Sequence, residues 1–327
     1  MRSLSGASLA VAAMLALGSA LSSAGCARVG ELKSMKAFKS ANQAYQQQDY
    51  KKAAALYEEA VESSPDSRPA HQSYFFLGNS YDNLYKPSKK GEAANDELLR
   101  KAVTNYQKAA EKLSTSEFPD DKKLGKLSLE YLVAAYGPDK LNDPAKAEPV
   151  VQKMIQMEPG EPTNYFQLAK IYEDAGAYDE AEKVYLQAKQ AKPNDPAVYM
   201  QLAGYYNRQG QFDKTIQALE ERAAKEPTNP EAFYTISTYY WDKAYRDFKL
   251  RENEKKDFVQ KGVEAVDHAL QIKPDYMEAL VYKNLLLRLQ ANMEKDPSKQ
   301  QALIKQADQL RDKAQELRKQ KAAGVSD

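Results

Sequence analysis

A segment of thirty residues occurs twice in tandem in this chain. The first copy, NYFQLAKIYEDAGAYDEAEKVYLQAKQAKP, ends at Pro193, and the second, VYMQLAGYYNRQGQFDKTIQALEERAAKEP, ends at Pro227. Their anchor residues all recur at an offset of 34: Tyr165 and Tyr199, Leu168 and Leu202, Tyr172 and Tyr206, Gly176 and Gly210, Pro193 and Pro227. A fixed period of this length predicts stacked units, which grow by addition and do not close a single core.

Each copy is expected to form two helices, because apolar residues recur at helical spacing in both of its halves. Gly176 and Gly210 fall between the halves, where a residue that tolerates positive φ is useful. Pro193 and Pro227 end the second helix, since proline cannot continue one. Small residues at Ala169, Ala181 and Ala188 would let neighbouring helices approach closely, and Tyr185 and Leu219 would fill the space between them.

This pattern resembles the tetratricopeptide repeat, whose consensus carries aromatic, leucine, small and proline residues at fixed positions. The first copy matches it at Tyr165, Leu168, Ala169, Tyr172, Ala181, Tyr185, Ala188 and Pro193. The second departs at Thr215 and Arg222, where small alanines are usual. The resemblance implies an all-α fold, a right-handed α-α superhelix of about seven helix pairs.

Weaker copies extend the array over nearly all of the chain, and we predict a solenoid from residue 34 to 321 with a tail at 322–327. Their anchors are Ala41, Tyr50, Ala53, Tyr57, Ala60 and Pro65; Leu77, Gly78, Tyr81, Ala102, Tyr106 and Ala109; Leu132, Tyr136, Ala147, Val151 and Pro159; and Phe233, Ile236, Tyr240, Val266, Ala269 and Pro274. A helix near 298–321, with charges around an apolar stripe, is expected to cap the array.

Two repeats carry extra residues between their paired helices, near 85–97 and 243–258. Insertions in a solenoid tend to lie on one face, which is often a binding face. The alternative is that they only lengthen the helix pairs with charged, solvated residues.

The chain's single cysteine, Cys26, follows a basic start, a short apolar stretch from Ser8 to Leu21 and a run of small residues. These features describe a secretory signal, and the apolar stretch is too short for a confident transmembrane helix. The segment resembles a bacterial lipoprotein signal, in which the cysteine after Ala24-Gly25 becomes the lipidated mature N-terminus. It departs from that pattern at Ser23, where leucine is preferred.

The resemblance implies removal of residues 1–25, lipidation of Cys26 and a short linker at 26–33. We therefore expect a lipid-anchored protein of the bacterial envelope, in the outer membrane and facing the periplasm. A soluble periplasmic or secreted protein with an ordinary cleaved signal is the alternative.

Catalysis is not indicated by any motif in the sequence. The histidines are His71 and His268, in different repeats, and one cysteine cannot supply a zinc site of Cys and His ligands. Nucleophile-elbow, Walker, dinucleotide-binding and EF-hand patterns are absent from the sequence. We expect no enzyme activity, cofactor or metal, and the net charge of +1 gives no reason to expect nucleic-acid binding.

In tetratricopeptide proteins the first helix of each pair lines a concave groove, so the resemblance implies a set of partner-binding candidates. They are Phe38, Asn42, Tyr45, Phe75, Asn79, Phe166, Lys170, Met200, Asn207, Arg208, Tyr234 and Trp241. Five of them, Phe38, Phe75, Phe166, Met200 and Tyr234, hold equivalent places and would form an apolar row. Such a row suits an extended peptide or a partner helix, although the same side chains could instead pack between repeats.

The expected function is a non-enzymatic scaffold that binds a membrane-proximal protein or peptide in this groove. An accessory subunit of an envelope enzyme complex is a further alternative.

Overall fold

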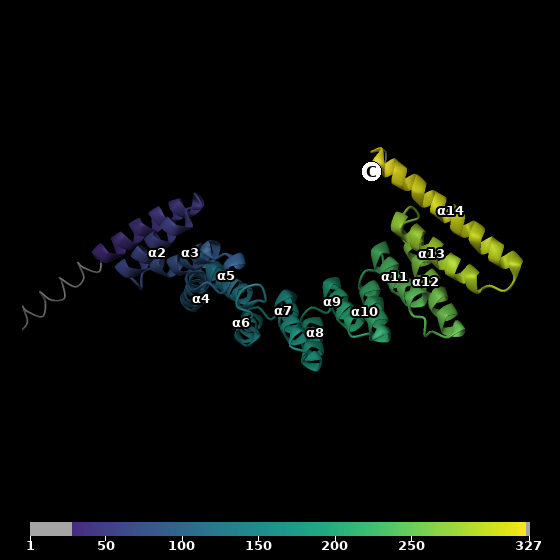
Figure 1. Cartoon of the computed structure of the whole chain (residues 1–327), viewed down its shortest axis with the longest axis horizontal. Coiled ribbons are helices and arrows are strands. Elements are labelled where there is room, and N and C mark those ends of the chain that lie inside the picture. Colours follow the sequence, from purple (N-terminus) through teal and green to yellow (C-terminus); the bar gives the residue numbers. More distant parts are fainter. Residues whose placement is uncertain (1–27, 325–327) are drawn as a thin grey trace, which may run out of the picture. The chain divides into compact units, whose positions relative to one another are not determined.

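The computed structural model describes residues 28–324, and this part of the chain is helical without a β-strand (Figure 1). Within each of two parts of the chain, successive helices pack against one another. Two compact units result, one ending at Pro159 and the other beginning at Gly160. The fold class is therefore the expected one, a solenoid of seven consecutive helix pairs within residues 28–324.

The first unit contains three helix pairs. Its first helix occupies residues 28–46 and is followed by α2 (Tyr50–Ser63), α3 (Arg68–Leu84), the 3-10 turn η1 (Pro87–Lys89), α4 (Ala93–Leu113), α5 (Pro119–Tyr136) and α6 (Pro144–Met157). Besides the contacts between consecutive helices, α3 packs against α5.

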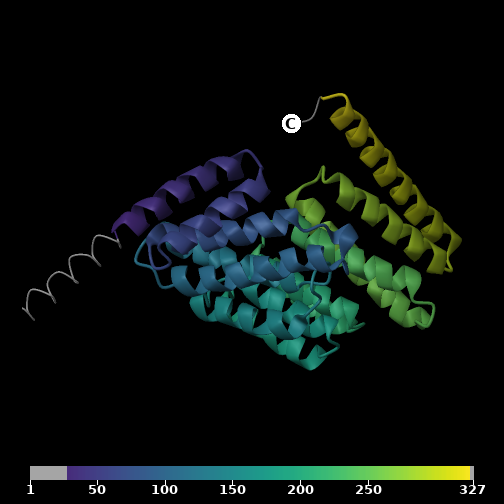
Figure 2. The ribbon, with the colours of Figure 1, turned by 60° about the vertical axis from the view of Figure 1, so that its left-hand side comes forward.

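The second unit contains four pairs. Its helices are α7 (Pro162–Asp174), α8 (Tyr178–Ala191), α9 (Pro196–Arg208), α10 (Phe212–Lys225), α11 (Pro230–Arg246), α12 (Glu252–Ile272), α13 (Met277–Met293) and α14 (Pro297–Ala322). Figure 2 shows α14 alongside α13, and α11 also packs against α13.

A repeated cap begins the first helix in three of the four pairs of the second unit, α7, α9 and α11. Glu161, Asn229 and Asp195 precede a proline at the first helical position, and each side chain accepts a hydrogen bond from a backbone N–H two residues later. Such a residue satisfies one of the free donors of a helix N-terminus, and proline loses nothing there because its missing N–H would be unpaired. The cap thus repeats with the same period as the core anchors.

The turn inside each pair also follows the period. Gly176 and Gly210 have φ of 74° and 69°, which confirms the predicted need for positive φ. Asn142, with φ of 53°, holds the equivalent place in the preceding pair, since asparagine tolerates this conformation better than most residues. The 34-residue period predicts the next such turn at position 244.

Position 244 is an alanine, and the sixth pair changes there. Ala244 is fully buried inside α11, which continues to Arg246, and α12 is longer than α8 or α10. Most of the residues expected to form an insertion at 243–258 therefore lengthen α11 and α12, and only residues 247–251 connect these two helices.

The other expected insertion, at 85–97, is a connection in its first part. Residues 85–92 link α3 to α4, and residues 93–97 form the first turn of α4.

Small residues at the repeat positions lie where neighbouring helices meet, because Ala169, Ala181 and Ala188 are completely buried. Arg222 stands at a position where the repeat consensus has a small residue, and its long side chain is bonded within the core. Buried Arg222 donates from Nε to Glu226 at 2.8 Å and from Nη1 to the sulfur of Met200 at 3.0 Å.

The expected linker at 26–33 is corrected in part, since residues 28–33 already belong to the first helix. A Cβ at Gly30 would lie 2.6 Å from the carbonyl oxygen of Ser63, so glycine permits the first turns to pack closely against the end of α2. Cys26 and the predicted signal at 1–25 lie outside the described residues.

Candidate functional site

The residues predicted to face the groove differ widely in exposure. Lys170, Asn207 and Arg208 are exposed; Phe38, Asn42, Tyr45, Phe166, Met200, Tyr234 and Trp241 are half-buried; Phe75 and Asn79 are buried, with 6% and 5% of their surface exposed. Phe75 packs against the rings of Phe76, Tyr106 and Tyr131. Phe75 and Asn79 are therefore core residues in this structure.

In the first unit, two of the predicted residues meet at a polar cavity of about 550 Å³. The Tyr45 hydroxyl donates to Asn79 Oδ1 at 2.5 Å, and Asn83 Nδ2 donates to the same oxygen at 2.8 Å. Lys140 Nζ and Asp82 form an ion pair of 2.5 Å in the same wall. These polar groups satisfy one another, so the cavity wall is ordered without a ligand.

In the second unit, Arg208 links α9 to α7. Its Nε and Nη2 donate to the two carboxylate oxygens of Glu173 at 3.0 and 2.8 Å, and the Tyr185 hydroxyl donates to Glu173 at 2.9 Å. Glu173 is buried while Arg208 is half in solvent. Two of the three forked donor nitrogens are directed at this carboxylate, which makes Arg208 chiefly a connection between repeats.

A chain of aromatic contacts links α11 to α13 and to Tyr276, the residue just before α13. From one ring to the next, the centroids are 5.3 Å apart for Tyr276 and Tyr234, 5.4 Å for Tyr234 and Tyr282, 5.6 Å for Tyr282 and Trp241, and 4.9 Å for Trp241 and Tyr245. We call these five residues the aromatic row. Tyr245 is 54% exposed and the other four are half-buried.

The polar groups of the aromatic row are neutral hydrogen-bond donors. Burial, together with the neighbouring hydroxyls of Tyr282 and Tyr276, raises the pKa of Tyr234 to about 12. Its phenol therefore keeps its proton at every physiological pH. The rings supply apolar contact area with a polar tip, a combination enriched in protein interfaces.

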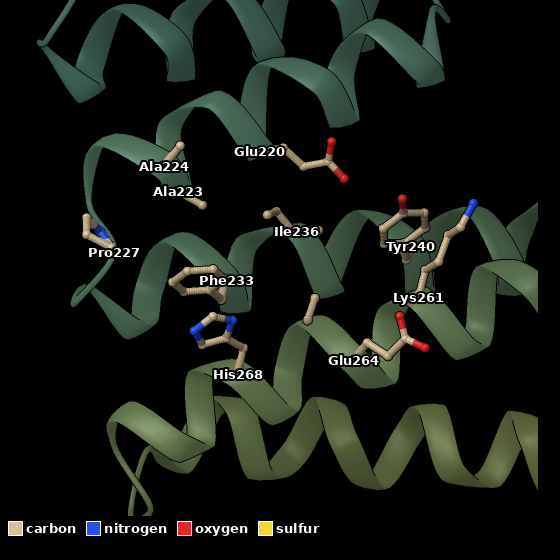
Figure 3. Close-up of a pocket in the computed structure, with 11 residues that line it drawn as sticks. Glu220, Ala223, Ala224, Pro227, Phe233, Ile236, Tyr240, Lys261, Glu264 and His268 are labelled. Carbon is tan, nitrogen blue, oxygen red and sulfur yellow. The ribbon is translucent and has the colours of Figure 1, made fainter.

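Sequence reasoning missed a second surface, an open cavity of about 650 Å³ bounded by α10, α11 and α12 (Figure 3). Its floor is apolar, with Phe233, Ile236 and Tyr240, and the carboxyl groups of Glu220 and Glu264 lie on opposite sides of that floor. His268 stacks on Phe233 with centroids 3.9 Å apart. The sequence offers one signal for this surface. Position 244, where the period calls for a turn, is an alanine, and this could have indicated that α11 and α12 are longer than the helices of the preceding pairs.

Within residues 28–324, no group of three or more His, Cys, Asp or Glu side chains is arranged to hold a metal ion. The helices of this part of the chain also include none with the length and apolar character needed to span a bilayer.

Comparisons with known proteins identify the repeats. Residues 38–110 and 140–204 each match a model of the tetratricopeptide repeat. No curated protein sequence is significantly similar to the chain. Among solved structures, the C-terminal part of a tetratricopeptide repeat-containing protein from Cytophaga hutchinsonii is 14% identical, with a TM-score of 0.50 over 84% of this chain and 95% of that one.

A tetratricopeptide repeat protein from Parabacteroides merdae is 12% identical over 84% of this chain and 99% of that one, with a TM-score of 0.45. MamA from Desulfovibrio magneticus is 16% identical over 59% of this chain and 95% of that one, with a TM-score of 0.39. The likeness to the Cytophaga hutchinsonii structure concerns the fold alone. The segments 38–110 and 140–204 match the tetratricopeptide repeat, and the described part of the chain has a solenoid fold of the tetratricopeptide type.

Proposed function

We propose that this protein is a non-enzymatic scaffold of the bacterial cell envelope that binds an extended segment of a partner protein along the first helices of its repeats. The tetratricopeptide repeats support a protein–protein interaction scaffold, and repeats of this kind are generally non-catalytic. The aromatic row is the observation that carries the binding surface, because partly exposed tyrosine and tryptophan are the residues most enriched among interface hot spots.

The envelope location rests on the sequence around Cys26, which resembles a lipoprotein signal. Helical structure already begins at residue 28, two positions after the cysteine. Two extended residues span about 7 Å, so a lipid on Cys26 would hold the first repeat directly at the membrane surface. The proposed partner is accordingly membrane-proximal.

Photo-crosslinking in living cells tests the binding face. The probe replaces Lys170 on α7 or Asn207 on α9, which are exposed on the predicted face, and Gln187, exposed on α8, is the control. We expect one discrete adduct from Lys170 and Asn207 and none from Gln187. Equal labelling at all three positions, or none at the first two, would contradict a partner on this face.

Fractionation of cells that produce the wild type or Cys26→Ala tests the anchor. We expect the wild type in the membrane fraction, with a mature mass that includes acyl chains, and the variant in the soluble fraction. A mature wild-type protein without acyl chains would point to the soluble periplasmic alternative. Membrane recovery of both proteins to the same extent would also remove the support for lipidation.

A further inference from the structure

Five unpaired hydrogen-bond donors line the aromatic row. None of the hydroxyls of Tyr234, Tyr245, Tyr276 and Tyr282, nor the indole N–H of Trp241, bonds to another residue within 28–324. Tyr234, Trp241 and Tyr276 pack on the core of α11–α13, and Tyr245 and Tyr282 are held against them by ring contacts. An ordered surface with free donors favours a ligand that presents unpaired acceptors at regular intervals.

Backbone conformation distinguishes the possible ligands. The carbonyl groups of a helix are already bonded within the helix, and an added strand needs the edge of a sheet, which residues 28–324 do not contain. A polyproline II segment has no internal hydrogen bonds, so all of its carbonyls are free, and its restricted conformation lowers the entropy lost on binding. The donors of the row therefore match an extended, proline-rich chain best.

Ring geometry supports the same ligand. Tyr282 is nearly perpendicular to both of its neighbours, at 86° to Tyr234 and 80° to Trp241, so the ring faces of the row point in different directions. Domains that bind proline-rich peptides use aromatic side chains as the contact surface for the prolines. Along α11, Tyr234 and Tyr245 are about 16 Å apart at 1.5 Å per residue. Roughly five residues of polyproline II, at 3.1 Å each, cover that length.

Charge at one end of the row indicates what flanks the prolines. Three acidic residues lie near Tyr276 and Tyr234, namely Glu226, Glu231 and Glu278. The basic residues at this end are Arg222 and Lys273. Glu226 and Glu231 both bond to Arg222, whereas Glu278 is exposed and has no ion pair among the described residues. Lys273 lies over the Tyr276 ring at 5.6 Å, a cation–π contact within the chain, so Glu278 is the acidic group at this end that is left for a basic residue of a ligand.

We infer that the aromatic row binds a proline-rich segment of a partner protein that carries a lysine or arginine beside its prolines. This inference rests on the proposed scaffold function and names the chemistry of its partner. The prolines stack against Tyr245, Trp241 and Tyr282, the free donors bond to the peptide carbonyls, and Glu278 pairs with the basic residue.

Titration of the purified protein with synthetic peptides tests the inference. The peptides are an arginine followed by a run of prolines, the same proline run without arginine, and an arginine followed by a Gly-Ser run of equal length. Fluorescence of Trp241, the only tryptophan in the chain and a member of the row, reports binding. We expect a saturable change with both proline peptides, tighter for the one with arginine, and no change with Gly-Ser.

Variants separate the row from the rest of the molecule. We expect Tyr245→Ala to weaken binding about tenfold, as for a moderate hot spot, because it removes a large exposed ring. Tyr178→Ala, which removes a comparably exposed tyrosine outside the row, should leave binding unchanged. Glu278→Gln should weaken binding of the arginine peptide alone. Circular dichroism confirms that each variant is folded.

Several results would overturn the inference: no saturable change below about 1 mM peptide, equal binding of the Gly-Ser peptide, or unchanged affinity in Tyr245→Ala. Binding of a soluble peptidoglycan fragment at the row, lost in Tyr245→Ala, with none of the proline peptides, would assign the row to a glycan. A discrete crosslink from Lys170 or Asn207 together with any of these results would leave the scaffold function standing and reject only the proline-rich partner.

Discussion

Asp121→Ala is expected to lower the free energy of unfolding of the first unit by about 3 kcal/mol, the range for loss of one partner from a buried ion pair. Asp121 is 2% exposed in the first turn of α5. Its carboxylate accepts two bonds from the Arg68 guanidinium at 3.0 and 3.1 Å, one from Gln72 at 2.6 Å and one from Ser116 at 3.0 Å. Because Arg68 and Gln72 belong to α3, this carboxylate fastens α3 to α5.

The adjacent Asp120 supplies a matched control, since it lies in the same first turn but is exposed. Both carboxylates interact with the helix dipole, so Asp120→Ala should cost no more than about 1 kcal/mol. Circular dichroism should detect the destabilisation, while Trp241 fluorescence, which reports the second unit, should change much less. Equal effects of the two substitutions would show that the dipole, and not the hydrogen-bond network, accounts for the stability.

Low pH should weaken the hydrogen bonds by which Asp121 joins α5 to α3. Burial alone would raise the pKa of Asp121, but the hydrogen bonds from Arg68, Gln72 and Ser116 outweigh it and hold the pKa below its ordinary value. A lowered folded-state pKa gives stability that is present above about pH 4, the unfolded-state value, and is lost as the pH falls through the folded-state value. The difference in stability between wild type and Asp121→Ala should therefore shrink below about pH 4.

Gly125→Ala is expected to destabilise the first unit by about 2 kcal/mol. A Cβ at Gly125 would lie 2.7 Å from the backbone nitrogen of Ser114 and 2.9 Å from the carbonyl carbon of Leu113. These are backbone atoms, so α5 must move away from the end of α4 to make room. Overpacking of this kind typically costs 1 to 3 kcal/mol, and the better helix propensity of alanine recovers only about 1 kcal/mol.

Gly204→Ala in α9 is the matched control, because it is also a glycine inside a helix. Its Cβ would meet only Nη1 of Arg208, at 3.3 Å, which is the one guanidinium nitrogen that does not bond to Glu173, so a small shift of this side-chain end makes room. We expect this variant to be neutral or up to about 1 kcal/mol more stable, as for glycine-to-alanine changes in helices. Chemical denaturation of both variants, followed by circular dichroism, measures the two effects. A stabilised Gly125→Ala protein would refute the close approach of α5 to α4.

The sequence alone was sufficient to predict the helix pairs. The recurrence of Tyr165, Leu168, Tyr172 and Gly176 at an offset of 34 determined the class of fold, because the same local pattern must produce the same local structure. It also predicted the positive φ at Gly176 and Gly210. The equivalent turn at Asn142 was not predicted, since a different residue type satisfies the same backbone requirement.

The exposure of the residues assigned to the groove was predicted less well. Periodicity assigns a residue to a helix face, but its exposure depends on side chains from other helices. Phe75 was assigned to the groove and is buried because Tyr106 of α4 and Tyr131 of α5 pack against it. Arg208 was a binding candidate and is bonded to Glu173, a residue 35 positions earlier.

The repeat pattern, read from the sequence by itself, therefore determined the all-α solenoid and the turns at Gly176 and Gly210, but not the helix boundaries near residue 244. Only the tertiary structure brought Tyr282 of α13 between Tyr234 and Trp241 of α11 and so formed the aromatic row. The physical reason is that helix formation depends on residues three or four positions apart, whereas three of the four ring contacts in the row join residues more than 30 positions apart, which only the packing of neighbouring repeats can set.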